Sequence, residues 1–365
     1  MIKSGSMKNI CFLNTTSFWG GGEKIHFDYA SKFKERGYTV FIAADKRNEL
    51  YSRANKANID TFALRLKNLS FLNPFKYIRL YRFFKKSKID TVIISTSHDT
   101  KVGVLTAKLA GLKRIVLYRA LAAPVKASKI NQYLYNNVIT HLIANSLETK
   151  RTMSMNFGNR LKRNIQIIYQ GLDFEEMSNR KINRHSFDSE KIIIGNAGRL
   201  TIQKGQHHFI EIAKILKKKS VNFKIVIAGT GELEEQLLKE IKINELQNEV
   251  ELLGFVEDMS SFMESIDIFA LTSEWEGFGY VIAEAMFARK PVVAFNITSN
   301  PELVKTGFNG YLVPFEDLEL FSEKLAELTK NKEIRETLGS QGCKFVQENF
   351  SLDNIIDQFE EQLAS

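Results

Sequence analysis

The sequence predicts an α/β protein with two parallel sheets, each covered by helices on both faces. Three observations lead to this prediction. The chain has 365 residues, of which 44% are hydrophobic, so two domains are expected rather than one core. Short β-branched runs alternate with helical patterns, as in parallel sheets. The alternation stops in a polar stretch at 172–191 and then restarts.

The first half contains the expected elements in order. An apolar strand at 10–13 leads into the glycine-rich turn "FWGGGEK", an amphipathic helix that stops at Gly37, and a second strand. Later strands are expected at 91–94 and 115–117. These elements predict a first domain at 7–173 and a linker at 174–190.

The second half repeats the pattern with the strands "KIIIGNAG", "FKIVIAG", "VELLGFV", "DIFALTS" and "PVVAF", each separated from the next by a helix. We therefore expect a second doubly wound domain at 191–345. A helical segment at 346–365 is expected to return toward the first domain.

Charge is distributed unevenly along the chain. The net charge is +9, but the first 180 residues carry 31 Lys and Arg against 12 Asp and Glu. A basic half is compatible with nucleic acid, anionic lipid or a phosphorylated substrate. Two cysteines cannot form a disulfide framework, and no apolar run is long enough to span a bilayer, so a cytoplasmic location is expected.

Glycine-bounded turns after strands provide the first candidate binding residues. Gly21 and Gly22 lie in one such turn and Gly229 in another, although a tight turn alone explains either. In "GNAGRLTIQKG", Arg199 and Lys204 follow a strand end, where two cations can converge on a diphosphate. Two solvated surface cations are the alternative.

The stretch "EGFGYVIAEAM" places Glu276 and Glu284 on either side of an expected helix start near Gly279. The first N–H groups of a helix have no partner within it and attract anions. At 1.5 Å per helical residue, the two carboxylates can lie on the order of 10 Å apart. A nucleotide sugar fits this arrangement, with its diphosphate at the helix start; a capping glutamate and an exposed one are the alternative.

The same stretch resembles the E-x7-E signature of the family-four retaining glycosyltransferases of GT-B architecture. "GRLTIQKG", "IAGTGEL", "LLGFVED" and "GFNGYLVP" stand in that family's order, and the likeness extends over most of residues 8–360. "IIYQGLDF" is similar to the family's interdomain stretch, with Gln170 in place of the usual Asn. The resemblance implies two Rossmann-like domains facing a cleft, and a retaining, metal-independent hexosyl transfer without a cofactor.

The resemblance also implies roles for individual residues. Arg199 and Lys204 would hold the donor diphosphate, Glu284 the ribose and Glu276 the transferred sugar. The remaining donor-side residues are the backbone around Phe255 and Val256 for the base, the segment Gly277, Phe278, Gly279 and Tyr280 for sugar and phosphate, and Gly21 and Gly22. Tyr118-Arg119 stands where many members carry a histidine, so Arg119 and His98 are the acceptor-side candidates.

The expected acceptor is a saccharide or a lipid-linked molecule of cell-surface polysaccharide or lipopolysaccharide synthesis. In "PFKYIRLYRFFKKSK", helical spacing puts Lys76, Arg79, Arg82 and Lys86 on one face. This face predicts peripheral attachment to an anionic membrane, with a solvated helix as the alternative. A sugar-nucleotide 2-epimerase of the same fold and a basic nucleic-acid-binding protein remain alternatives, although no nucleic-acid-binding module is recognisable, so nucleic acid is not expected as a partner.

Overall fold

The structure is a computed structural model that describes residues 9–17, 19–157, 159–187 and 190–364. Its internal contacts divide the chain into two units. The first runs to Gly171 and also includes the segment from Leu352 onward. The second runs from Leu172 to Ser351.

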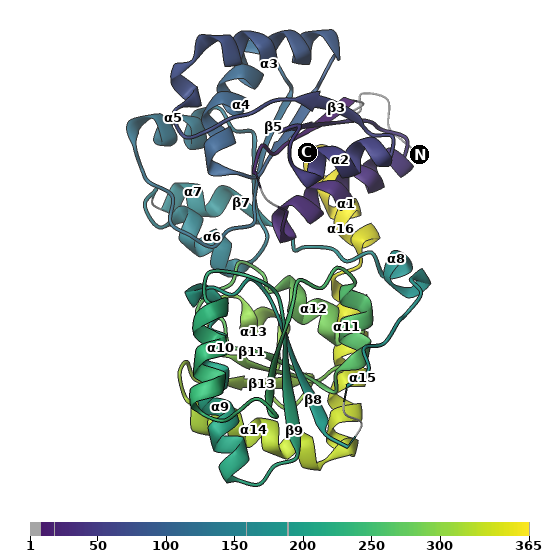
Figure 1. Ribbon diagram of the computed structural model, residues 1–365. Helices are drawn as coiled ribbons and strands as arrows, with labels where there is room; N and C mark the ends of the chain where they lie inside the picture. The colour runs from purple at the N-terminus through teal and green to yellow at the C-terminus, as the bar shows by residue number, and fades with distance from the viewer. Residues whose placement is uncertain (1–8, 18, 158, 188–189, 365) are drawn as a thin grey trace. The chain divides into compact units, whose positions relative to one another are not determined.

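The first unit is built on a seven-stranded sheet with the strand order β3-β2-β1-β4-β5-β6-β7. Every pair of neighbouring strands is parallel, so helices connect the strands across the faces of the sheet (Figure 1). The strands are β1 (Asn9–Leu13), β2 (Thr39–Ala44), β3 (Asp60–Ala63), β4 (Thr91–Ile94), β5 (Arg114–Arg119), β6 (His141–Ala144) and β7 (Ile165–Ile167). The helices are α1 (Gly21–Glu35), α2 (Glu49–Lys56), η1 (Ser70–Leu72), α3 (Pro74–Lys86), α4 (Ser97–Ala110), α5 (Lys129–Asn137), α6 (Leu147–Ser154), α7 (Asn159–Asn164) and α16 (Leu352–Ala364).

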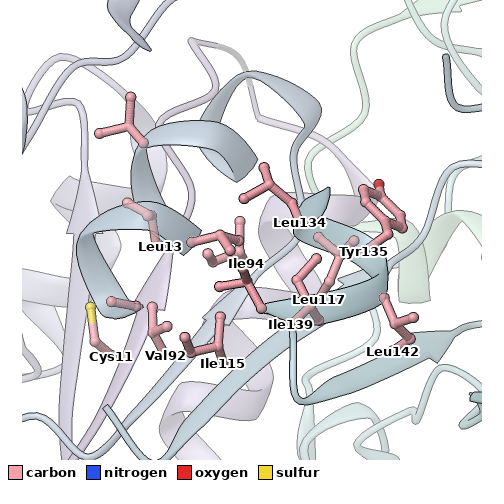
Figure 2. Packing of buried hydrophobic residues seen from close by; sticks show 14 of the residues in the cluster. Cys11, Leu13, Val92, Ile94, Ile115, Leu117, Leu134, Tyr135, Ile139 and Leu142 are labelled. Carbon is pink, nitrogen blue, oxygen red and sulfur yellow. The ribbon is translucent and has the colours of Figure 1, made fainter. Parts of the chain in front are cut away.

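Both faces of this sheet are buried. Successive side chains of each strand point to opposite faces, and the residues on either face pack into a hydrophobic cluster of their own. Cys11 of β1, Val92 of β4 and Ile115 of β5 belong to one hydrophobic cluster, which Leu134 of α5 helps to cover (Figure 2). The alternate residues Ile10 and Phe12 of β1, Ile93 of β4, and Val116 and Tyr118 of β5 belong to a second cluster. This two-sided burial explains why the strands are almost continuously apolar in sequence.

Helix α16 belongs to the first unit although it ends the chain (Figure 1). The ring of Phe359 lies 5.6 Å from that of Tyr29 in α1 and 5.4 Å from that of Tyr118 in β5. Arg36 pairs with Asp357 at 2.6 Å. The segment expected to return began at 346, but α15 continues through Asn349, so the returning helix starts later, at Leu352.

The second unit is built on a six-stranded parallel sheet with the order β10-β9-β8-β11-β12-β13. The strands are β8 (Ile192–Ala197), β9 (Phe223–Ala228), β10 (Val250–Gly254), β11 (Ile268–Leu271), β12 (Val292–Phe295) and β13 (Gly310–Val313). The helices are α8 (Phe174–Asn179), η2 (Ile202–Lys204), α9 (His208–Lys218), α10 (Glu234–Ile243), α11 (Met259–Ser265), α12 (Tyr280–Phe287), α13 (Asn300–Leu303), α14 (Leu318–Lys330) and α15 (Lys332–Asn349). In the first sheet β1 lies between β2 and β4, and in the second β8 lies between β9 and β11, so the strand order reverses there. Ligands of such folds bind at that reversal of strand order.

The segment expected as a linker at 174–190 carries regular structure in its first part and belongs to the second unit. The Asp173 side chain caps α8 by accepting a hydrogen bond from the Glu176 N–H. Beyond α8, the backbone N–H groups of Asn183 and His185 donate to the hydroxyls of Ser261 and Ser265. These partners lie about 80 residues away, which is why the polar composition of the segment suggested a linker instead.

Candidate functional site

The candidate donor-side residues of the second unit gather at the carboxyl edge of its sheet. Arg199 follows β8, Gly229 follows β9 and Phe255 follows β10, and these three strands are neighbours. Glu276 and the start of α12 follow β11, which pairs with the other side of β8. Residues that are up to about 80 positions apart in sequence therefore share the edge at which parallel sheets bind ligands.

A partly buried ion pair lies at this edge. The Lys204 ammonium is 2.7 Å from Oε1 of Glu276, and their side chains are 19% and 8% exposed. The Ser273 hydroxyl donates to the same carboxylate oxygen at 2.7 Å. Because both contacts that the described residues make with the Glu276 carboxylate use Oε1, Oε2 remains able to accept further hydrogen bonds. The Glu276 N–H donates to the Thr298 hydroxyl, which orients the loop.

Glycines allow the loops that carry these residues to approach one another closely. Gly205 has a φ of +64°, and a Cβ at this position would lie 2.0 Å from the carbonyl oxygen of Thr272. Gly229 has a φ of +144°, and its Cβ would lie 1.9 Å from the carbonyl oxygen of Gly198. Both positions exclude a side chain by conformation and by space. Gly229 is thus required by packing as well as being a candidate for binding.

Helix α12 begins where the sequence predicted. Gly279 is its N-cap, in a left-handed conformation with a φ of +80°, and no side chain caps the helix. The first turn therefore depends on other partners for its N–H groups, and it presents the positive end of the helix dipole. Asn300 lies beside this start, and its buried Oδ1 has no partner among the described residues.

The other predicted donor-side residues differ in exposure. Arg199 and Phe255 are exposed, the latter by 73%, whereas Val256, Gly277, Tyr280 and Glu284 are half-buried. Phe278 is only 2% exposed and packs edge-on against Phe350 at 5.3 Å, so only its backbone can contact a ligand. The structure thus places all these residues around one strand edge, while their roles stay predictions.

The acceptor-side candidates His98 and Arg119 lie at the carboxyl edge of the first unit's sheet. Arg119 ends β5, is 4% exposed, and donates to the Ser97 hydroxyl at 3.3 Å and the Ala123 carbonyl at 2.8 Å. Its Nε has no partner among the described residues, and burial lowers the pKa of the guanidinium. His98 follows Ser97 and lies 3.5 Å from the Asp99 carboxylate. Both candidates therefore lie where the start of α4 meets the end of β5.

Sequence reasoning missed several buried ionisable residues at this edge. Asp99 is fully buried and accepts hydrogen bonds from the Thr15 N–H at 2.8 Å and the Thr15 hydroxyl at 2.6 Å. Burial raises the pKa of Asp99. His26 bonds the Ser95 hydroxyl, and burial lowers its pKa to about 3. Thr15 and Ser95 lie within two residues of the ends of β1 and β4, and that position is the signal by which these groups could have been found.

Gly21 and Gly22 begin α1, and a Cβ at either position would meet nothing within 4 Å. Steric crowding therefore does not require glycine at either position. Glu23, the next residue, is buried and accepts a hydrogen bond from the Asn14 amide at 3.2 Å. Burial raises the pKa of the Glu23 carboxyl.

Comparison with known proteins adds a family match. Residues 177–345 match the model of the family "Glycosyl transferases group 1". The capsular polysaccharide biosynthesis glycosyltransferase CapM of Staphylococcus aureus is 29% identical over 267 residues, which cover 71% of this chain and 67% of CapM. The UDP-Gal:alpha-D-GlcNAc-diphosphoundecaprenol alpha-1,3-galactosyltransferase of Escherichia coli is 28% identical over 299 residues, covering 76% of each chain.

A solved structure confirms the fold class. The Anabaena protein Alr3699/HepE, crystallised in complex with UDP-glucose, superposes with a TM-score of 0.81 at 22% identity. The match covers 98% of this chain and 99% of that one. The expected architecture of two parallel-sheet, Rossmann-like domains is therefore confirmed.

Proposed function

We propose that this chain, a glycosyltransferase whose residues 177–345 belong to the group 1 family, transfers a hexose from a UDP-sugar with retention of anomeric configuration. The proposed acceptor is a lipid-linked or polymeric saccharide of the bacterial envelope. The observation that carries the proposal is the partly buried Lys204–Glu276 pair beside the N-terminus of α12. The names of the Escherichia coli and Anabaena proteins support UDP as the nucleotide.

The chemical demand of this reaction is the negative charge that develops on the departing diphosphate. Lys204, Arg199 and the positive end of α12 all lie at the β8 and β11 strand ends. Fixed positive groups of this kind stabilise leaving-group charge without having to reorganise during the reaction. They do for the diphosphate what a divalent ion does in other transferases, so we propose a metal-independent transfer.

Glu276 is better suited to bind sugar hydroxyls than to act as a nucleophile. Its carboxylate is held through Oε1 by Lys204 and Ser273, and an ion pair with a cation lowers the nucleophilicity of a carboxylate. Oε2 can still accept hydrogen bonds from a sugar. Glu284, half-buried on α12, would bind the ribose, and the backbone at Phe255 and Val256 would receive the base.

The acceptor side of the proposal rests on Arg119. A buried guanidinium without a carboxylate partner among the described residues is costly unless a ligand supplies negative charge. An acceptor that carries a phosphate or carboxylate meets that requirement. His98, which adjoins Ser97, would stand beside the same group.

A donor screen by thermal shift tests the proposed function. A ligand that binds only the folded state raises stability by RT ln(1+[L]/Kd), which is about 2.7 kcal/mol at 100 times Kd. We expect UDP and UDP-hexoses to raise the melting temperature more than the matched adenosine, guanosine and cytidine compounds. Equal shifts for all four bases would contradict the assignment of UDP. Turnover of a UDP-sugar to its epimer without any acceptor would point instead to an epimerase.

The proposed site of membrane attachment is α3 and the edge of the sheet beside it. Arg79, Arg82 and Lys86 are exposed on this helix, and Leu80 and Phe84 anchor it to the core. Apolar side chains are also exposed here: Phe75 by 77%, Ile78 by 45%, and Leu69 and Leu72 of the preceding turn by 69–72%. None of the helices in the described part of the chain has the length and apolarity needed to cross a bilayer.

A groove of about 800 Å³ lies between α3 and strands β2 and β3, and its lining combines apolar and cationic side chains. Phe62, Phe75 and Ile78 are apolar, and Arg79, Arg82 and Lys86 are cationic. An anionic lipid surface complements such a lining, since headgroups meet the cations and acyl chains meet the rings. Each Lys or Arg near an anionic bilayer contributes about 1 kcal/mol. We therefore propose peripheral attachment at the inner leaflet through this surface.

Vesicle cosedimentation tests the attachment. The protein should pellet with phosphatidylglycerol vesicles at low salt, remain in solution with phosphatidylcholine vesicles, and dissociate at high salt as screening grows. Reversing Lys76, Arg79, Arg82 and Lys86 to Glu should abolish binding. The matched control reverses the charge of four exposed lysines of the second unit, Lys214, Lys217, Lys218 and Lys219, and should still bind. Equal loss in both variants would show that total charge, not this surface, attracts the membrane.

A further inference from the structure

Two histidines and a glutamate converge on the loops that carry the donor-side ion pair. His207 and His208 are the N-cap and first residue of α9, and Glu274 lies between β11 and Glu276. One ligand atom from each of these three residues lies within 4.8 Å of the other two. None of the three residues is among the site residues that the sequence predicted.

His208 is the member of the cluster that most needs an explanation. It is 8% exposed, and its buried Nε2 has no hydrogen-bond partner among the described residues. Native proteins pair nearly all buried polar atoms, so such an atom indicates a partner from outside the chain. The His208 ring packs edge-on against the ring of Phe295, with 5.5 Å between the ring centroids. Gly205 also lies close to it, since a Cβ at that position would be 3.1 Å from Cδ2 of His208.

Glu274 is the acidic member of the cluster. Glu274 is half-buried, and its carboxylate has no ion pair or hydrogen bond with any described side chain. The carboxylate supplies negative charge that offsets part of the positive charge of the cation and of the start of α9.

We propose that His207, His208 and Glu274 form a binding site for a zinc-class dication. Two imidazoles and one carboxylate, with a fourth position open to water, are a known donor set for Zn²⁺. Imidazole ligands disfavour Mg²⁺ and Ca²⁺, which take oxygen ligands. Zn–N and Zn–O bonds of ~2.1 Å bring ligand atoms to within roughly 3.4 Å of each other, and the partly exposed His207 and Glu274 can rotate to close this distance.

The site would couple two loops that the donor site needs. His207 and His208 continue the segment that carries Lys204, and Glu274 belongs to the loop that carries Glu276. Within the chain itself, these loops are joined by the Lys204–Glu276 pair and by several hydrogen bonds. The Glu274 N–H donates to the Gln203 carbonyl at 2.8 Å, the Gln203 amide to the Trp275 carbonyl at 3.1 Å, and the Thr272 hydroxyl to the Gly205 carbonyl at 2.9 Å. A bound ion would add a further link, so its role is to stiffen the loops.

The test uses the metal-stripped, tag-free chain and the ions Zn²⁺ and Co²⁺ alone. We expect one ion per chain, visible Co²⁺ absorption bands of a low-coordinate site, and a rise in melting temperature with Zn²⁺ but not with Mg²⁺. His208→Ala and the conservative Glu274→Gln should each weaken binding by at least about 10-fold, since even loss of an outer-shell partner costs that much. His185→Ala removes an exposed histidine outside the cluster and serves as the matched control that keeps wild-type binding.

Two results would overturn the proposal. One is a wild-type chain that binds Zn²⁺ no more tightly than the His208→Ala and Glu274→Gln variants. The other is Co²⁺ that binds but shows the weak absorption of an octahedral, all-oxygen environment. Neither readout involves a sugar donor, so failure here leaves the proposed transferase function standing, and failure of the donor screen leaves this site standing.

Discussion

Replacement of Lys204 by alanine should lower the rate of sugar transfer by about 10²- to 10³-fold, the usual cost of removing one preorganised charge-stabilising group. The Lys204 side chain is 19% exposed and its ammonium is held at 2.7 Å from Glu276, so it is a fixed charge rather than a mobile surface cation. Arg199→Ala should lower the rate by a similar factor. Steady-state transfer from UDP-sugar to acceptor, with Mg²⁺ and Mn²⁺ omitted, is the measurement.

Two further variants make the Lys204 result interpretable. Lys204→Gln retains a hydrogen-bond donor for Glu276 but loses the charge, so it should be nearly as slow as Lys204→Ala. Lys214→Ala removes an exposed lysine that pairs with Glu211 on α9, and it should transfer at the wild-type rate. If Lys204→Gln retains the wild-type rate, the role of Lys204 is to position Glu276 and not to stabilise the diphosphate.

The two glutamates of the E-x7-E stretch should fail in different ways. Glu284→Ala should weaken UDP binding by about 10-fold, as expected from the ~1.5 kcal/mol of one hydrogen bond to a charged group. Glu276→Gln should leave UDP affinity nearly unchanged and abolish transfer, because its proposed partner is the sugar. The isosteric Gln keeps an acceptor for Lys204 and Ser273 and so preserves the buried contacts at Oε1.

Calorimetric titration with UDP, followed by transfer assays on the same preparations, separates these roles. Glu323→Ala, at an exposed position of α14, is the matched control and should behave as wild type in both assays. Equal losses of UDP affinity in the Glu276 and Glu284 variants would show that the assigned division between sugar and ribose is wrong.

Local sequence patterns predicted the elements of the fold well. The strand expected at 91–94 is β4, and the helix expected near Gly279 begins at Tyr280. Such elements follow from side-chain period and glycine position, which are local properties. The polar stretch at 174–190 was harder to interpret, because its hydrogen-bond partners in α11 are distant in sequence.

The contacts within the site depend on tertiary structure and could not be predicted in the same way. Lys204 and Glu276 are 72 residues apart, and only the pairing of β8 with β11 brings their loops together. The burial of Arg119 likewise follows from the packing of α4 and the 120–123 turn around the end of β5. Sequence spacing identified these residues as candidates, whereas their partners became visible only in the folded chain.

In the proposed site, a nucleotide sugar places its diphosphate at the start of α12 beside Lys204. A crystal structure of the chain with bound UDP-hexose tests this placement. We expect diphosphate oxygens within about 3 Å of the backbone N–H groups at 279–281 and of the Lys204 ammonium. We also expect sugar hydroxyls on Oε2 of Glu276. A diphosphate bound elsewhere in the chain, with the Lys204–Glu276 pair untouched, would contradict this placement.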